Sequence, residues 1–333
     1  MQDIRLNVLT IGNAIVDVLA ETEDDFLKRE GIVKGSMTLI DEGRADHLYD
    51  RMNSVVEASG GSAANTAAGI ASFGGSVSYI GLVKDDVLGK IFDNDLKTLG
   101  VEHRLKFSPD GPGTGRCLVM ITPDAERSMN TYLGAAANLS EETLDLALIR
   151  DASITYLEGY LFDRAAAKAA YFLAAKTAHA AGRKVSLSLS DSFCVHRHRS
   201  DFRQLVQAET DILFANEDEI LALYDVDTFE DAVAAVRMDC EMACLTRGKV
   251  GSALVTADTV HHIKALEVDR VVDTTGAGDQ YAAGVLYGLT NGATLDVAGH
   301  YGSIAASEVI THVGPRPELE LSSLLQQNWA AKF

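Results

Sequence analysis

The sequence predicts an α/β protein in which helices cover both faces of a mostly parallel central sheet, with a small β-rich lid beside it. The main observation is that short apolar runs alternate with helix-forming segments along most of the 333 residues. The second is that two segments, 14–45 and 104–134, break this alternation with strand-like runs split by charged or turn residues. We therefore treat 1–333 as one domain and expect these two segments to form the lid.

The first third of the chain begins the alternation. The apolar run LNVLTIG at 6–12 predicts a buried strand, and the small residues of SAANTAAGIASFG at 62–74 predict a helix. VSYIGLV at 77–83 predicts the next strand, and a helix over 85–100 ends at Gly100. Each strand is followed by a helix, which is the pattern of parallel β-α units.

The middle of the chain repeats this pattern. ASITYLEGY at 152–160 predicts a strand, 164–182 a helix that a glycine stops, and KVSLSLS at 184–190 another strand. DILFAN at 211–216 and ACLTRG at 243–248 add two more strands. In folds of this kind, ligands bind where strands end and helices begin.

Near the C-terminal end, DTTGAGDQYAAGVLYGL places a glycine-rich turn between two elements. VDRVV at 268–272 predicts a short β-branched strand, and QYAAGVLYGL at 280–289 predicts a helix that is apolar nearly all round and therefore buried. Gly284 and Gly288 lie on one face of this helix, where a neighbouring backbone can approach closely.

Composition excludes several classes of protein. Hydrophobic residues make up 47% and charged residues 23% of the chain, as in globular proteins, and no apolar run is long enough to cross a bilayer. The N-terminus shows no signal-peptide pattern, and four sparse cysteines suggest reduced thiols in the cytoplasm. The formal net charge of −19 argues against nucleic-acid and membrane-surface partners. Because the chain as a whole is negatively charged, a phosphate site would need backbone N–H groups, a metal ion or a few basic side chains close to the phosphate.

The glycine turn predicts an anion site. The first N–H groups of a helix point out of its end without intrahelical partners, and Gly276 and Gly278 allow the backbone to curl around an anion. Asp279 lies at the same helix mouth, where a carboxylate would repel phosphate unless it takes a proton from an attacking nucleophile. The alternative is that Asp279 only caps a scaffold helix.

Three other strand ends carry polar residues, and each has a structural alternative. Asn13 and Asp17 follow the first strand, and a glycine pair in GGSAANTA precedes a helix that carries Asn65. These residues also suit plain turns and caps. Asn216 and Glu219 of NEDE follow another strand, where they equally suit a helix capping box.

Taken together, these stretches resemble the ribokinase-like (PfkB) carbohydrate kinases. DTTGAGDQYAAGVL is similar to the C-terminal signature of that family, GGSAANTA to its N-terminal glycine signature, and NEDE to its N-x-x-E motif. The resemblance covers essentially the whole chain in the family's order. Within the family, GNAIVDV and AGHYGSIAAS resemble the adenosine kinase pattern most. The resemblance implies a ribokinase-like three-layer α/β/α fold and an ATP-dependent kinase.

The resemblance also implies roles for individual residues. Asp279 would be the general base, and the N–H groups of the anion turn would bind the transferring phosphoryl group. Arg127 would offset phosphate charge. The residues implied in catalysis are Asp279, Gly276, Ala277, Gly278 and Arg127; those in acceptor binding are Asn13, Asp17, Met37, Gly60, Gly61, Asn65, Leu133 and Tyr160; those at the nucleotide are Asn216, Thr246, Gly248 and His300.

Cofactors follow from the same resemblance. ATP and Mg²⁺ are implied, with Asn216 and Glu219 holding the metal through water, and Asp273 and Thr275 lie where many family members bind a monovalent cation such as K⁺. We expect adenosine as the acceptor because Met37, Leu133 and Tyr160 suit a flat base. A free sugar, inosine or guanosine stays open as the acceptor, as does a non-catalytic binder. The chain is expected to act as a monomer or a homodimer.

Overall fold

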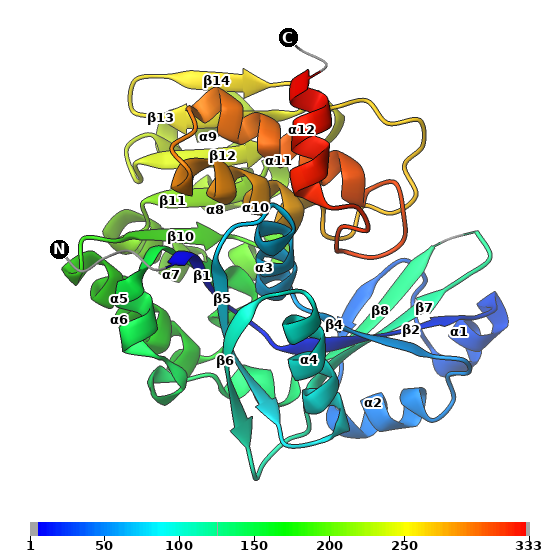
Figure 1. Ribbon diagram of the computed structural model, residues 1–333. Helices are drawn as coiled ribbons and strands as arrows, with labels where there is room; N and C mark the ends of the chain where they lie inside the picture. Colours follow the sequence, from blue (N-terminus) through cyan, green and yellow to red (C-terminus); the bar gives the residue numbers. More distant parts are fainter. Residues whose placement is uncertain (1–5, 125, 331–333) are drawn as a thin grey trace.

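The computed structural model describes residues 6–124 and 126–330 (Figure 1). Its centre is a nine-stranded sheet with the strand order β14-β13-β12-β11-β10-β9-β1-β5-β6. The strands are β1 (Leu6–Ile11), β5 (Val77–Lys84), β6 (Glu102–Ser108), β9 (Ala152–Glu158), β10 (Lys184–Ser188), β11 (Ile212–Asn216), β12 (Met242–Thr246), β13 (Ser252–Thr256) and β14 (Val260–Ile263).

Seven of these strands run parallel, from β6 to β12, and the edge strands β13 and β14 pair antiparallel. The order reverses at β1, which lies between β9 and β5. Open α/β sheets bind ligands outside the carboxyl ends of strands near such a reversal. The expected mostly parallel sheet is therefore confirmed, and its topology marks the place of the site.

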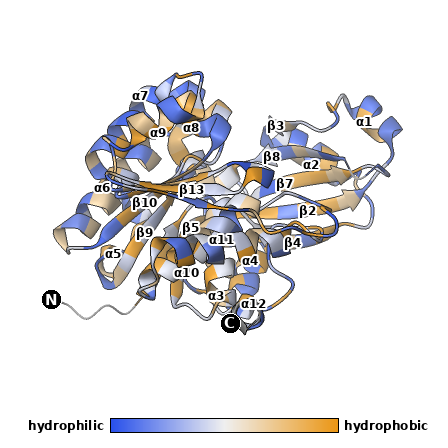
Figure 2. Ribbon diagram, turned by 90° about the horizontal axis from the view of Figure 1, so that it is seen from above, coloured by the Kyte–Doolittle hydropathy of each residue, from blue (hydrophilic) through white to orange (hydrophobic). Residues whose placement is uncertain are grey.

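Helices cover both faces of the sheet, as expected (Figure 2). One face carries α5 (Leu146–Asp151), α6 (Ala165–Ala180), α7 (Ser192–Glu209), α8 (Glu217–Tyr224) and α9 (Phe229–Val236). The other carries α3 (Ser62–Ser72), α4 (Val87–Thr98), α10 (Ala277–Thr290) and α11 (Leu295–Val309), with α12 (Leu321–Ala330) against α3 and α11. Along β1, Leu9 and Ile11 enter the first core and Val8 enters the second, which is the alternation of a strand buried on both faces.

A smaller, separate sheet lies beside the large one (Figure 1). Its order is β3-β8-β7-β2-β4, formed by β2 (Ile15–Glu21), β3 (Met37–Leu39), β4 (Val56–Gly60), β7 (Gly115–Ile121) and β8 (Arg127–Tyr132). Two short helices, α1 (Asp24–Glu30) and α2 (Glu42–Tyr49), belong to the same region. Strands from both expected lid segments meet in this sheet.

The boundaries of this region differ from the sequence-based expectation. β4 belongs to the smaller sheet although it lies outside 14–45 and 104–134. Residues 104–108 fall in β6, at the edge of the large sheet, where β6 pairs in parallel with β5. Both strands contain polar and charged residues that interrupt the apolar pattern, so neither was visible as a strand.

The strand predicted over 268–272 is absent, and this prediction was wrong. The segment is irregular, and the N–H groups of Val272 and Asp273 donate to the carbonyl oxygen of Ile310 at the end of α11. The backbone at the end of this segment is therefore paired with a helix terminus and not with a neighbouring strand. Among residues 6–124 and 126–330, no helix is both long and apolar enough to cross a membrane.

The close approach expected at Gly284 is confirmed. A Cβ atom built on Gly284 would lie 2.4 Å from the carbonyl oxygen of Tyr301 and 2.5 Å from the nitrogen of Gly302, both backbone atoms of α11. Helix α10 thus packs on α11 through glycine, and this contact fixes the helix whose first turn carries Asp279.

We expect Gly284→Ala to lower the free energy of unfolding by about 1–3 kcal/mol, because the α11 backbone would have to move to admit the methyl group. Chemical denaturation of both proteins measures the change. Gly43→Ala in α2 is the matched control, since its nearest neighbour to a new Cβ is 3.6 Å away. A loss at Gly284 no larger than that at Gly43 would contradict the packing argument.

Candidate active site

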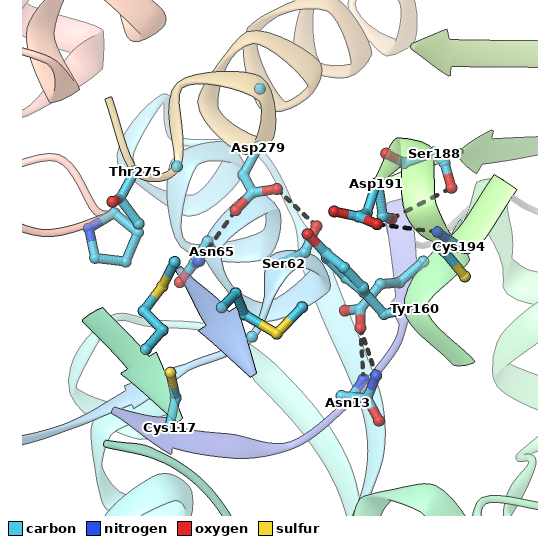
Figure 3. A pocket seen from close by; sticks show the side chains of 18 of the residues that line it. Asn13, Ser62, Asn65, Cys117, Tyr160, Ser188, Asp191, Cys194, Thr275 and Asp279 are labelled. Carbon is cyan, nitrogen blue, oxygen red and sulfur yellow. Dashed lines mark hydrogen bonds between the residues drawn. The ribbon is translucent and has the colours of Figure 1, made fainter. Parts of the chain in front are cut away.

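A cavity of about 920 Å³ lies at the carboxyl ends of the central strands, between the large sheet and the smaller one (Figure 3). Asn13 follows β1, Glu158 ends β9, Ser188 ends β10, Asn216 ends β11 and Thr246 ends β12, and all five line it. The first turns of α3 and α10 close its floor. The strand ends that the sequence analysis selected therefore meet at a single cavity.

Asp279, in the first turn of α10, is held by two donors from α3. The Ser62 hydroxyl donates to its Oδ1 at 2.6 Å, and the Asn65 amide donates to its Oδ2 at 3.0 Å (Figure 3). Burial raises the pKa of Asp279 to about 6, while Ser62, Asn65 and the charge of Arg316 oppose this rise. The result is a fixed carboxylate that is ionised near neutral pH and able to accept a proton there.

The turn before Asp279 requires glycine at Gly276. This residue caps α10 with φ of 78°, and a Cβ there would lie 2.5 Å from the carbonyl oxygen of Pro315. Gly276 and Gly278 line the cavity next to Asp279. The N–H of Ala277 instead donates to the Thr274 carbonyl oxygen at 3.2 Å, so it is already engaged within the turn.

Glu158 is a site residue that the sequence analysis missed. Its Oε1 accepts from the Asn13 side-chain amide at 2.8 Å and from the Asn13 N–H at 3.3 Å, and its Oε2 accepts from the Ala63 N–H at 2.8 Å. Burial raises its pKa to about 7, against these hydrogen bonds. One buried carboxylate thus joins β9, the end of β1 and the first turn of α3. In the sequence, Glu158 is the single charged residue at the end of an apolar strand, and this position could have identified it as a site residue.

Two hydrogen-bond acceptors without a partner lie near Glu158. The Oδ1 atom of Asn13 is buried and has no hydrogen-bond partner within 6–124 and 126–330, and the Asp17 carboxylate accepts no hydrogen bond from the same residues. Burial raises the pKa of Asp17 to about 6, and the charges of Arg316 and Arg127 oppose it. Both side chains line the cavity and are suited to accept from hydroxyl groups of a ligand.

The smaller sheet gives the cavity an apolar wall. Ile15, Cys117, Val119, Leu19, Met129 and Leu133 form one cluster on its inner face, and all six line the cavity. Met37 on the edge strand β3 lines it too and is 44% exposed. Across the cavity lie Tyr160 and Phe193, the latter 72% exposed in α7 and not identified from the sequence.

Arg127 lies in the smaller sheet and reaches the anion turn. Its Nη1 contacts Asp273 Oδ2 at 2.8 Å and the Thr275 hydroxyl at 3.2 Å. Asp273 also accepts from the N–H and hydroxyl of Thr275 and from the N–H of Gly314. Burial would raise the pKa of Asp273, but these hydrogen bonds and the charge of Arg127 outweigh it and hold that pKa below its usual value.

Asn216 and Glu219 form the capping box that the sequence left as an alternative. The Asn216 side chain accepts from the Glu219 N–H at 2.8 Å, and the Glu219 carboxylate accepts from the Asn216 N–H and side-chain amide. Glu219 is 6% exposed yet lines the cavity, and burial raises its pKa to about 7. A structural role for the pair is confirmed, while contact with the cavity keeps a second role open.

Most of the residues selected from the sequence meet in the one cavity. Those that line it are Asn13, Asp17, Met37, Gly61, Asn65, Arg127, Leu133, Tyr160, Asn216, Glu219, Thr246, Thr275, Gly276, Gly278 and Asp279. Those outside its lining are Gly60, Gly248, Asp273, Ala277 and His300. Gly60 packs against the Asp17 carboxylate, and Asp273 contacts Arg127 and Thr275. Gly60 and Asp273 therefore contact residues that line the cavity without lining it themselves.

Comparison with known families decides what kind of site this is. Residues 31–321 match the family described as pfkB family carbohydrate kinase. The chain belongs to the pfkB family. It is therefore an ATP-dependent phosphotransferase with a ribokinase-like fold.

Similar pfkB proteins include both nucleoside and sugar kinases. An adenosine kinase from Sinorhizobium meliloti is 47% identical with a TM-score of 0.91, covering 97% of this chain and 99% of that one. A probable sugar kinase protein from Rhizobium etli CFN 42 is 45% identical with a TM-score of 0.92, covering 98% and 99%. A probable chloroplastic fructokinase-6 from Arabidopsis thaliana is 34% identical over 248 residues, 72% of this chain and 64% of that protein. The chain is adenosine kinase-like, and relatives with sugar acceptors are also present.

The kinase family implies a divalent metal with the nucleotide, and the residues present fit one held through water. Both oxygens of Glu219 already accept hydrogen bonds, but the carboxylate lines the cavity, and a cation would relieve the cost of its buried charge. Asp273 is a poor direct ligand for a monovalent cation, because Arg127 and three other donors occupy its two oxygens.

The raised pKa of Glu158 predicts how stability depends on pH. The pKa of Glu158 is about 7 in the folded protein, against an ordinary value of 4.5 for the unfolded chain. The protonated side chain therefore contributes its full stability below pH 4.5, and the fold loses this contribution as the pH rises through about 7. The glutamine of Glu158→Gln cannot ionise, so the stability of this variant does not fall over the same pH range. We therefore expect the free energy of unfolding of the variant, relative to the parent, to increase from pH 5 to pH 8. Urea titrations at each pH measure it, and a difference that stays constant with pH would contradict the assignment.

Proposed function

We propose that this kinase transfers the terminal phosphoryl group of ATP to the 5′-hydroxyl of a nucleoside, with adenosine as the preferred acceptor. The observation that carries the proposal is the pairing of two open polar acceptors, Asn13 Oδ1 and the Asp17 carboxylate, with the apolar face of the smaller sheet in one cavity. Ribose hydroxyls would donate to the first two. A flat base would lie between this apolar wall and Tyr160, and stacking of a base on an aromatic side chain is worth about 1–3 kcal/mol.

Asp279 would act as the general base. Its carboxylate is held from one side by Ser62 and Asn65, so its position is set before the acceptor arrives. It would remove the proton of the 5′-hydroxyl as that oxygen attacks phosphorus. General-base assistance of this kind contributes roughly 10²–10⁴-fold in rate.

The anion turn and Arg127 would stabilise the transferring group. Gly276 and Gly278 line the cavity beside Asp279, at the end of a fourteen-residue helix whose N-terminus favours negative charge. Arg127, which now contacts Asp273 and Thr275, lies next to this turn and could turn to a phosphate oxygen. Thr246 and Asn216 line the cavity on the opposite side and would contact the nucleotide, with Mg²⁺ supplying further positive charge when it is bound.

The smaller sheet would act as a lid. It provides one wall of the cavity, and Met37 and Leu39 on its edge strand are 44% and 49% exposed, so apolar surface remains to be covered. An acceptor base placed against this wall would draw the sheet over the site and exclude water from the phosphoryl group. We also propose a cytoplasmic location, in keeping with four cysteines that are all present as thiols.

A free sugar is the second candidate acceptor, favoured by the probable sugar kinase and the fructokinase among the similar proteins. A sugar has hydroxyl groups on every side and needs polar partners throughout, since unpaired buried polar groups are costly. The cluster of Ile15, Val119 and Leu133 offers none. The apolar wall therefore favours the nucleoside.

We expect Asp279→Asn to lower kcat by about 10²–10⁴-fold while the protein stays folded, because the variant keeps the shape of the side chain but not its proton acceptor. For the parent enzyme, kcat/KM should rise with pH through about 6, as the base loses its proton. Steady-state assays and thermal melts check both expectations. Turnover of the variant near that of the parent would remove Asp279 from the mechanism.

We expect purified enzyme with MgATP to phosphorylate adenosine with a higher kcat/KM than inosine, ribose or fructose. Adenosine and the furanose form of ribose carry the same primary hydroxyl group, so the ratio of their kcat/KM values reports mainly what the base contributes. A coupled ADP-release assay measures all four acceptors. A higher kcat/KM for either free sugar would contradict the nucleoside proposal and leave the kinase family untouched.

A further inference from the structure

Arg316 is a basic residue outside every motif identified in the sequence, yet it contacts Asn65, one of the two residues that hold Asp279. It lies in the segment between α11 and α12, and its Nε donates to Asn65 Oδ1 at 3.2 Å. Its Nη1 donates to the Ser59 hydroxyl at 2.5 Å, at the end of β4 in the smaller sheet. Arg316 is absent from the cavity lining, so it touches the site only through other residues.

The contact with Asn65 determines which way that amide points. A guanidinium can only donate hydrogen bonds, so the atom of Asn65 that faces Arg316 must be the oxygen. The amide nitrogen is then turned to Asp279 Oδ2, to which it donates at 3.0 Å. If the amide were reversed, its oxygen would face a carboxylate oxygen, and both the donor to Asp279 and the acceptor for Arg316 would be lost.

The segment that carries Arg316 is anchored independently of its guanidinium. The Pro315 carbonyl oxygen accepts from Gln280 at 3.0 Å, and the Gly314 N–H donates to Asp273 at 2.9 Å. Glu308 accepts from the next two backbone N–H groups along the segment, those of Glu318 and Leu319. A change of the Arg316 side chain therefore leaves the path of the segment held at both ends.

The charge of Arg316 also acts on Asp279. Burial raises the pKa of Asp279, and Arg316 opposes that rise. Burial lowers the pKa of Arg316 itself, while the nearby carboxylates oppose this. The titratable and charged groups that interact with Asp279 from the surrounding elements are Asp17 of β2, Tyr156 and Glu158 of β9, Tyr160, Glu219 of α8 and Arg316. Arg316 is the basic residue among these groups, and Arg127 acts on the neighbouring Asp17.

We propose that Arg316 is a positioning residue for phosphoryl transfer, which fixes the Asn65 amide as a donor to Asp279 and places a permanent positive charge behind that carboxylate. The inference rests on the proposed role of Asp279 as the base. It also assigns a function to the segment after α11: its backbone supports the anion turn through Pro315 and Gly314, and its one guanidinium orients the floor of the site.

The test compares Arg316→Gln, which removes the charge, with Arg316→Lys, which keeps the charge but not the two-pronged contact. With Gln, we expect kcat at high pH to fall about 10–100-fold, because small displacements of a reacting group are costly. The acid limb of kcat/KM should move upward by about one pH unit, since the base gains proton affinity. With Lys, kcat should fall similarly, but the acid limb should stay near that of the parent.

Arg150→Gln is the matched control. It makes the same charge change on an exposed residue of α5, directly before the amino end of β9, whereas the cavity lies at the carboxyl ends of the strands. Its kcat and acid limb should equal those of the parent. Thermal melts of all variants distinguish unfolding of the protein from displacement of Asn65 and Asp279. If Arg316→Gln is unstable, Arg316→Lys still tests the proposal.

A double-mutant cycle tests the route through Asn65. In an Asn65→Ala background, Arg316→Gln should change kcat at high pH far less than it does in the parent, because the residue it acts through is gone. Additive effects would overturn the positioning role. So would parental kcat and an unchanged acid limb in Arg316→Gln. If Asp279→Asn retains turnover, the proposed mechanism fails first; if it is inactive while Arg316→Gln behaves like the parent, only the present inference fails.

Discussion

The contact between the first turn of α3 and Asp279 is the constraint on which this site depends. Ser62 and Asn65 each donate to one oxygen of a carboxylate more than two hundred positions away in the chain. That contact joins the N-terminal and C-terminal thirds of the protein at the reversal point of the sheet. It requires α3 and α10 to lie with their first turns side by side, and the glycine packing of α10 on α11 holds one of the two in place.

Around this contact, two charged residues, the buried Glu158 and the partly buried Arg316, hold neighbouring groups in position. Glu158 fixes the start of α3 through Ala63 and the end of β1 through Asn13. Arg316 fixes Asn65 from the other side. Each of these groups is costly to bury, and each is stabilised by donors or acceptors that also belong to the site. The stability of the floor and the geometry of the reaction are therefore set by the same hydrogen bonds.

The sequence predicted the sheet, the helices on its two faces and most of the cavity lining, because these follow from hydrophobic periodicity and from glycine turns. It did not predict Glu158 or Arg316. Both act through partners far away in the chain, at separations of 95 residues to Ala63 and 251 to Asn65, which no local pattern encodes. The error at 268–272 has the same origin, since β-branched residues predict a strand only where a neighbouring strand is available to pair with them.

The electrostatics of the cavity explain how a chain of net charge −19 can receive a nucleotide. Two basic residues near the site are matched to local acids: Arg127 contacts Asp273, and Arg316 lies near Asp17 and Asp279. Asp17, Glu158, Glu219 and Asp279 all have raised pKa values because burial disfavours their charge. A polyanionic ligand adds to that cost unless positive charge arrives with it. In the proposed mechanism, Mg²⁺ bound to ATP would supply such charge, and Arg127 would exchange Asp273 for a phosphate oxygen. Nucleotide binding would then depend on the metal more strongly than acceptor binding, because an uncharged acceptor held by Asn13, Asp17 and the apolar wall adds no negative charge.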